Sequence, residues 1–153
     1  MADKEIRTVM AALTDKHVLL PNAAVAEVLP YEPPEAFKDA PGWLLGELAW
    51  RGWQVPIISY LRLIDDKAGS AVTPEARILI IKTMGESTQV YYIGLVTQGV
   101  PKLKTVSVKT LIENQTDGLP EAVYSMVTID GQIALIPELG KLTHIVEQAA
   151  YGN

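Results

Sequence analysis

Few side chains in this sequence have the type and spacing that catalysis requires. Asp65 and Asp66 form an acidic pair beside a stretch with glycine and serine, and His17 is one of two histidines. Together in a cleft, these three side chains could act as the acids and bases of a small β-barrel enzyme. Because an acidic pair in such a stretch is more typical of a solvated loop, the enzyme is the less favoured interpretation.

Metal and nucleophile chemistry is equally sparse. His144 and Glu147 are three residues apart and could share one face of a helix, but such a pair is more typical of a helix surface than of a metal site. The chain has no cysteine, which excludes thiolate ligands, thiol catalysis and disulfides. Phosphate-binding loops and a nucleophile elbow are also missing from the sequence. We therefore expect no catalytic residue, no metal and no cofactor.

Charge and hydropathy narrow the class of protein further. The net charge of -5 argues against a nucleic-acid partner. Lys102, Lys104 and Lys109 alternate, which indicates a solvated or protected strand face more than a phosphate site. No apolar run approaches the roughly 20 residues of a membrane span, and no signal-peptide core follows the N-terminus. We expect a cytoplasmic protein without membrane insertion.

The most unusual segment runs from residue 41 to residue 60 and contains all three tryptophans. Its apolar run is interrupted by Arg51, whose charge would be costly to desolvate unless it were paired. We therefore expect a carboxylate or a carbonyl to meet Arg51. Trp50 or Trp53 would be a docking anchor for a partner if its ring were exposed.

The hydrophobic pattern predicts a mostly β chain. Strands are expected at 6–13, 17–20, 24–29, 44–50, 53–59, 77–83, 89–97, 122–128 and 132–136, with a short helix at 106–113 and a C-terminal helix at 138–150. The Asp130-Gly131 pair is a strong hairpin signal. Two β-rich halves suggest two small packed barrels, a first lobe at 15–66 and a second at 76–137, with a flexible boundary at 65–75.

Four segments resemble, in order, the motifs of the CheW-like domain family. They are Val18-Leu19-Leu20-Pro21 followed by Val25-Ala26-Glu27-Val28, the Pro41 to Ile58 segment with Trp50-Arg51-Gly52 and Val55-Pro56-Ile57-Ile58, then Ile93-Gly94-Leu95-Val96, and Ala134 to Leu142. The resemblance covers about residues 6 to 146, so the whole chain, 1–153, is identified as a single CheW-like domain. Two motif glycines, Gly46 and Gly94, are expected at close strand contacts.

The resemblance implies a fold of two five-stranded, SH3-like β-barrels with a shared core. It also implies a non-enzymatic adaptor that couples the cytoplasmic tip of a methyl-accepting chemoreceptor to the regulatory domain of a CheA-type histidine kinase. Trp50, Ser59, Gln98 and Pro137 depart from the family pattern. They leave open a divergent, ChpC-like or PilI-like scaffold of a parallel pathway, such as type IV pilus twitching, without direct kinase coupling.

The resemblance also supplies candidate partner-binding residues. They are Val25, Glu27, Val28, Trp50, Arg51, Ile93, Leu95, Val100 and Leu103. Glu27 and Arg51 occupy family positions that face each other, either as a structural ion pair or as part of a docking surface. If that pair were deeply buried, breaking it would cost about 3 kcal/mol. Of the six apolar candidates we expect two to reach the surface, because alternating apolar residues serve grooves and cores alike.

Overall fold

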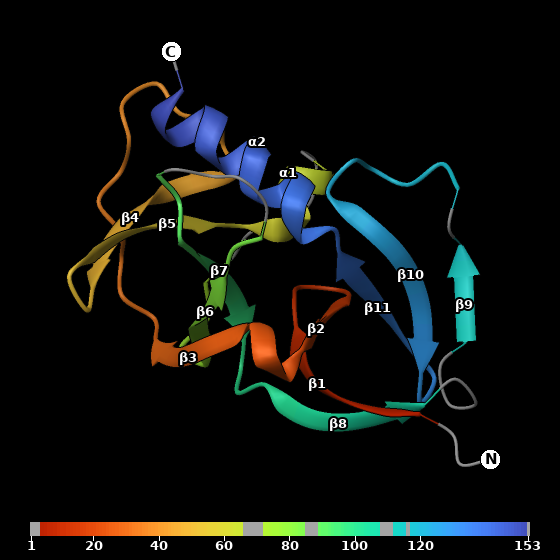
Figure 1. The fold of residues 1–153 in the computed structure, drawn as a ribbon. Helices are drawn as coiled ribbons and strands as arrows, with labels where there is room; N and C mark the ends of the chain where they lie inside the picture. The colour runs from red at the N-terminus through yellow and green to blue at the C-terminus, as the bar shows by residue number, and fades with distance from the viewer. Residues whose placement is uncertain (1–3, 66–71, 85–88, 108–111, 116, 153) are drawn as a thin grey trace.

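The computed structural model describes residues 4–65, 72–84, 89–107, 112–115 and 117–152. Mostly β structure is confirmed (Figure 1). The strands are β1 (Glu5–Ala12), β2 (His17–Pro21), β3 (Val25–Pro30), β4 (Leu44–Trp50), β5 (Trp53–Ile58), β6 (Ala76–Lys82), β7 (Tyr92–Gln98), β8 (Lys102–Ser107), β9 (Ile112–Gln115), β10 (Val123–Ile129) and β11 (Gln132–Pro137). The helices are the 3-10 turn η1 (Asn22–Ala24), α1 (Tyr60–Ile64) and α2 (Leu139–Tyr151).

The strands form two sheets, and both ends of the chain contribute to the same one. The terminal lobe has the strand order β8-β1-β2-β11-β10-β9, and the central lobe has the order β3-β6-β7-β5-β4. The expected division into consecutive lobes, 15–66 and 76–137, is therefore wrong. Long-range parallel pairing of β2 with β11 brings the two chain ends together, and β6 and β7 complete the central lobe. The expected boundary lies inside the central lobe, and residues 66–71 of it are outside the described residues.

The two lobes have the same pattern of strand pairing, although the chain passes through corresponding strands in a different order. From the edge strand of each sheet inward, the first two strand pairs are antiparallel and the third pair is parallel. The last pair is an antiparallel hairpin. Strands β8, β1, β2, β11 and β10 thus correspond to β3, β6, β7, β5 and β4. The expected pair of five-stranded SH3-like barrels is confirmed, with β9 as an additional strand. Helix α1 follows β5, and α2 follows the corresponding strand, β11.

The final hairpins are alike in detail. Arg51 and Gly52 have φ values of 48° and 82°, and Asp130 and Gly131 have values of 50° and 78°. Two consecutive residues with positive φ are the signature of the type I′ turn, which matches the twist of a two-residue hairpin. Each hairpin also has an irregularity in register, next to Gly46 in one and Ser125 in the other, and the two sites are equidistant from their turns.

Gly46 accommodates a segment that covers the edge of β4. The backbone of Glu35 exchanges two hydrogen bonds of 2.9 Å with that of Glu47. A Cβ atom on Gly46 would collide with the carbonyl group of Glu35, and the φ of 150° also favours glycine. Gly94 lies where the Ile57 and Ile78 side chains leave no room for a Cβ. Close packing at both glycines is confirmed.

One hydrophobic cluster joins the two lobes. It includes Leu20 and Leu135 of the terminal lobe, Ile58 and Leu79 of the central lobe, and Leu142 of α2. Helix α2 packs against this cluster through its apolar stripe and begins where the Glu138 side chain accepts a hydrogen bond from the N–H of Gly140. The predicted C-terminal helix is confirmed. No helix among the described residues is long and apolar enough to cross a bilayer.

The predicted helix at 106–113 is wrong for the residues that the structure describes. Val106 pairs with Ile6 in the β8–β1 ladder, and Ile112 pairs with Thr128 in the β9–β10 ladder. Pairing with neighbouring strands outweighs the weak local helix preference of this segment. Residues 108–111 lie outside the described part of the chain.

Two tyrosines tie the lobes together in opposite directions. Tyr60 of α1 donates a hydrogen bond of 2.9 Å to the carbonyl of Ala122, just before β10. Tyr151 of α2 donates one of 3.0 Å to Oε2 of Glu47 on β4. Burial raises the pKa of Tyr60 well above its usual value. Burial, together with the hydrogen bond to Glu47 and the charge of that carboxylate, raises the pKa of Tyr151 to about 12.

Candidate partner-binding surfaces

The Glu27–Arg51 pair closes the barrel of the central lobe. Nη2 of Arg51 lies 2.9 Å from Oε1 of Glu27, so the expected pairing is confirmed. Glu27 is on the edge strand β3, whereas Arg51 is at the apex of the β4–β5 hairpin at the other edge of the sheet. The ion pair therefore joins the two edges.

The pair is not deeply buried. The side chain of Arg51 is 68% exposed and that of Glu27 is 33% exposed. Arg51 lies in the exposed turn between β4 and β5, so its charge needs little desolvation. An exposed pair is typically worth no more than about 1 kcal/mol, and the larger cost that follows from deep burial does not apply. The pair is consequently accessible to a partner.

Trp50 supports this pair from below and is not an exposed anchor. Its ring is buried, and its indole N–H donates a hydrogen bond of 3.0 Å to Oε1 of Glu27. Cζ of Arg51 lies 5.0 Å from the centroid of the same ring, within cation–π range. Trp50 therefore fixes the carboxylate and supports the guanidinium, but offers little surface of its own.

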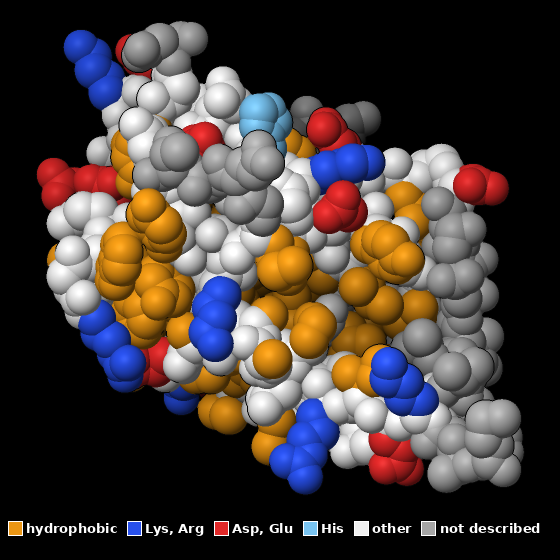
Figure 2. Space-filling model, in the orientation of Figure 1, with side chains coloured by type: hydrophobic (Ala, Val, Ile, Leu, Met, Phe, Trp, Pro, Cys, Tyr) orange, Lys and Arg blue, Asp and Glu red, His pale blue; other side chains and the backbone are white. Residues whose placement is uncertain are grey.

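Trp53 is the exposed tryptophan. Its side chain is 41% exposed, and its ring centroid lies 4.8 Å from that of Tyr91 and 5.6 Å from that of Tyr92. Figure 2 shows hydrophobic side chains gathered over the β4–β5 hairpin. The sequence predicts that Trp50 or Trp53 could be an anchor but does not tell which ring is exposed. That difference depends on tertiary contacts, because Tyr92 and Glu27 cover the Trp50 ring.

The apolar candidates divide between surface and core. Ile93 and Leu95 are buried in the shared cluster, which corrects their placement on a binding surface, because β7 is a central strand covered on both faces. Val100 and Leu103 are 70% and 74% exposed, Val28 is also exposed, and Val25 is half-buried. Three of the six apolar candidates therefore reach the surface, one more than expected. Other exposed large apolar side chains that sequence reasoning missed are Ile6, Val72, Met84, Tyr91, Tyr124 and Ile133.

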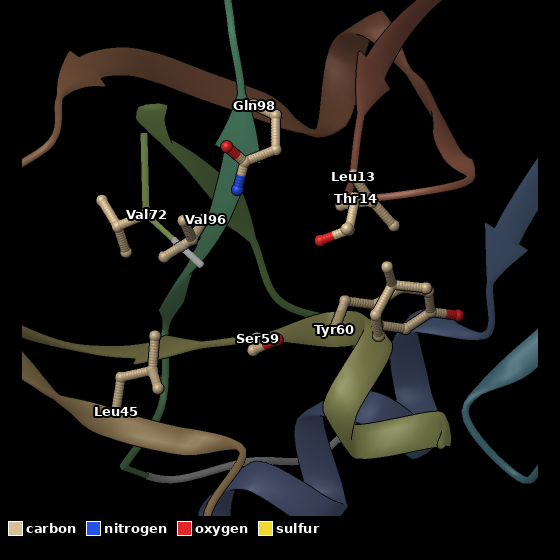
Figure 3. Close-up of a pocket in the computed structure, with 9 residues that line it drawn as sticks. Leu13, Thr14, Leu45, Ser59, Tyr60, Val72, Val96 and Gln98 are labelled. Carbon is tan, nitrogen blue, oxygen red and sulfur yellow. The ribbon is translucent and has the colours of Figure 1, made fainter. Parts of the chain in front are cut away.

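A small cavity lies between the two lobes (Figure 3). Thr14 reaches it from the β1–β2 connection, Tyr60 from α1, and Val96 and Gln98 from β7. Its volume of about 20 Å³ is room for roughly one water molecule. This cavity therefore has no space for a substrate or a peptide side chain.

The side chains with catalytic potential are dispersed. His17 lines a pocket that does not include Asp65, and His144 is an exposed residue of α2. Glu147 accepts a hydrogen bond of 3.1 Å from the N–H of Gln89. Among the described residues there is no group of three potential metal ligands. Asp66 and Lys109 lie outside the described residues, and Lys104 pairs with Asp130 at 2.9 Å.

Two interleaved barrels with a shared core, a surface ion pair and exposed apolar side chains define a class of protein that presents surfaces to other proteins. Residues 7–147 match the model of the CheW-like domain, and the chain belongs to this family.

The structure is similar to that of the scaffolding protein TtCheW from Thermoanaerobacter tengcongensis, with a TM-score of 0.74 and 18% sequence identity. The similarity covers 98% of this chain and 97% of TtCheW. It therefore extends to both lobes and both helices. A search of the curated proteins returned no significant match.

Proposed function

We propose that this chain is a non-enzymatic adaptor of the cytoplasm, which couples the cytoplasmic tip of a methyl-accepting chemoreceptor to a CheA-type histidine kinase. The observation that carries the proposal is the CheW-like match over residues 7–147, nearly the whole chain. A scaffold of this kind acts by holding partners in a fixed geometry, which requires rigid and partly apolar surfaces.

The Glu27–Arg51 apex supports the proposal because it is both accessible and rigid. One carboxylate oxygen of Glu27 accepts from Trp50 and pairs with Arg51, so the two charged groups are held before a partner arrives. Preorganised groups lose little entropy on binding. Val28, the next residue on β3, is also exposed, but successive strand residues point to opposite faces, so it adds apolar area on the other face of this edge strand.

Val100 and Leu103 supply a second exposed apolar element, on β8 and the connection that precedes it. Leu103 belongs to the edge strand of the terminal lobe and Val100 to the connection before it, whereas Glu27 belongs to the edge strand of the central lobe. An adaptor needs at least two surfaces, and the two edge strands provide one each.

Binding of the purified protein to the regulatory domain of a CheA-type kinase from the same genome tests the proposal, alongside binding to a receptor-tip fragment. We expect saturable micromolar binding to the kinase domain. Arg51→Glu should weaken binding to one of the two partners by about tenfold, because it reverses a preorganised charge. Leu103→Glu should weaken binding to one of them as well.

Asp130→Lys is the matched control. It reverses the charge of the corresponding turn residue in the terminal lobe, which is equally exposed and also paired. It should leave binding at the Arg51 surface unchanged. If folded wild-type protein binds neither a CheA-type kinase domain nor a receptor tip, the coupling function is wrong, and a scaffold without kinase coupling takes its place.

A further inference from the structure

A groove lies between the β4–β5 hairpin and the C-terminal end of α2, which passes near β4 (Figure 1). Its volume is about 430 Å³, and it is lined by Glu47, Gly52, Trp53, Gln54, Gln89 and Tyr151. Neither Glu27 nor Arg51 lines it. The groove therefore adjoins the surface proposed above for the receptor and the kinase but does not include its ion pair.

The aromatic walls of the groove are held in place by other rings. Trp53 packs against Tyr91, with 4.8 Å between centroids, and Tyr151 makes an edge contact of 5.9 Å with Phe37. Rings that are already fixed can receive a ligand at little entropic cost. This groove is thus preformed for an occupant.

The carboxylate of Glu47 lies in the groove without a cation beside it. Oε2 of Glu47 accepts the hydrogen bond from Tyr151, and no described Lys, Arg or His lies within ion-pair distance. The described lining residues include no basic side chain, and Glu147 bonds to the backbone of Gln89 at the edge of the groove. The groove consequently has a negative charge that is not neutralised by the residues described.

The Glu27–Arg51 site has the same arrangement of a carboxylate and an aromatic donor, with a cation added. There Trp50 donates a hydrogen bond of 3.0 Å to Glu27, and Arg51 both pairs with that carboxylate and lies over the Trp50 ring. In the groove, Tyr151 donates a hydrogen bond of the same length to Glu47. An aromatic donor thus holds a carboxylate in both places. Only in the first is a guanidinium present.

We propose that this groove binds an arginine side chain from an extended segment of a partner protein. A planar guanidinium can stack on the Tyr151 ring while it donates two hydrogen bonds to Glu47, which the ammonium of lysine does less well. The side-chain oxygen of Gln54 can accept from one of the remaining donors. Trp53 would contact apolar atoms of the same segment.

The test uses the full chain, labelled with ¹⁵N, and two small probes. N-acetyl-arginine amide is compared with N-acetyl-citrulline amide, which has the same shape but no charge. The arginine probe should shift the indole signal of Trp53 and the amide signals of Gln54 and Gln89 saturably, with a dissociation constant on the order of 1 mM. The citrulline probe should bind at least about tenfold more weakly.

Two variants locate the site. Glu47→Gln should weaken the arginine probe by about tenfold, because it removes the charge but keeps the acceptor of Tyr151. Trp53→Ala, at an exposed position, serves as a second variant and should also weaken binding. Asp130→Asn removes an exposed carboxylate elsewhere and should change nothing.

Equal binding of both probes, undiminished binding to Glu47→Gln, or tighter binding of an uncharged proline-rich peptide would each overturn the proposal. Neither a kinase nor a receptor enters the measurement. The arginine groove and the coupling function can therefore fail independently.

Discussion

The two barrels share a topology but differ at the same point of their final hairpins. Arg51 pairs with Glu27 in the central lobe, and Asp130 pairs with Lys104 in the terminal lobe, each at 2.9 Å. The exposures also match, at 68% and 33% in one pair and 69% and 32% in the other. The signs of the charges are reversed. An ion pair between turn and edge strand is therefore a property of this barrel, independent of which residue is the cation.

The neighbours of the two pairs are what differ. Trp50 and Trp53 flank the turn in the central lobe, whereas Ile129 and Gln132 flank it in the terminal lobe. The tryptophans add a ring beneath the guanidinium and an exposed aromatic surface. The comparison teaches that topology places a charged apex on each barrel, and the flanking residues decide whether that apex has an aromatic surface beside it.

The largest effect on stability is expected at the register irregularity of each hairpin, where one lobe has room for a side chain and the other does not. Gly46→Ser copies the residue found at the corresponding position, Ser125, but its Cβ would meet the backbone of Glu35. Because this clash adds to the strain of a positive φ at a residue other than glycine, we expect a loss of about 3 kcal/mol in the free energy of unfolding, measured with urea. Ser125→Gly, the reverse exchange, should cost only about 1 kcal/mol. Similar losses for both would show that the lobes are not different here.

A smaller loss of stability is expected when the residue before each turn is replaced by leucine. Trp50→Leu removes ring contacts with Tyr92 and Arg51 as well as the hydrogen bond to Glu27. We expect a loss of about 2 kcal/mol in urea unfolding. Ile129→Leu at the corresponding position should cost less than about 1.5 kcal/mol. If Trp50→Leu left the stability unchanged, its ring would not be part of the support for the apex.

Removing the hydroxyl group of each tyrosine that links the lobes should destabilise the protein more where the hydrogen bond is more deeply buried. Tyr60→Phe removes one of the two hydrogen bonds to the buried carbonyl of Ala122, which still accepts from the N–H of Glu138, and we expect a loss of about 1 kcal/mol near neutral pH. Tyr151→Phe should cost only about 0.5 kcal/mol, because Glu47 is half-buried and can bind water. Thermal or urea unfolding of the two variants, beside the wild type, gives the order. The reverse order would contradict it.

The same tyrosines should make stability depend on alkaline pH. Both phenols have a raised pKa in the folded protein, so the unfolded chain releases their protons first. The contribution of these phenols to the free energy of unfolding is therefore constant below about pH 10 and decreases at higher pH. For Tyr151 the decrease ends near its folded pKa of about 12. Each Phe variant should flatten this decline, and Tyr60→Phe more than Tyr151→Phe.

The smallest effects are expected from the two ion pairs. Arg51→Glu and Asp130→Lys should each cost no more than about 1 kcal/mol, since both pairs are exposed, and less in high salt. Double-mutant cycles with Glu27→Arg and Lys104→Glu measure the coupling within each pair, which should be similar in the two lobes. Arg51→Glu alone should cost about 0.5 kcal/mol more than Asp130→Lys alone, because Arg51 also contacts the Trp50 ring. Equal costs of these two variants would mean that the ring contributes nothing measurable.

Local patterns in the sequence predicted the hairpins well but not the assembly of the lobes. The Asp130-Gly131 turn and the α2 stripe are short-range signals, and both are found in the structure. The parallel pairing of His17 with Ala134 links positions far apart in the chain, and no local pattern specifies it. The consecutive lobes expected from the sequence failed for this reason.

The candidate site was predicted in part. The Glu27–Arg51 pair came from the family resemblance and is present, but its exposure depends on the place of Arg51 in the exposed turn between β4 and β5. Ile93 and Val100 have similar side chains, yet one is in a central strand and the other lies beyond the sheet. Burial of this kind is decided by tertiary packing, which alternation alone does not reveal.

The interleaved path of the chain also sets an order for synthesis. The central lobe is contiguous from β3 to β7, so all its strands have been made once Gln98 has left the ribosome. The β1–β2 hairpin is made earlier, but its parallel partner β11 is completed only at Pro137. Nascent chains therefore carry the β2 edge of this hairpin unpaired while the central barrel closes behind it, and an exposed strand edge of that kind is open to wrong partners until β11 has been made.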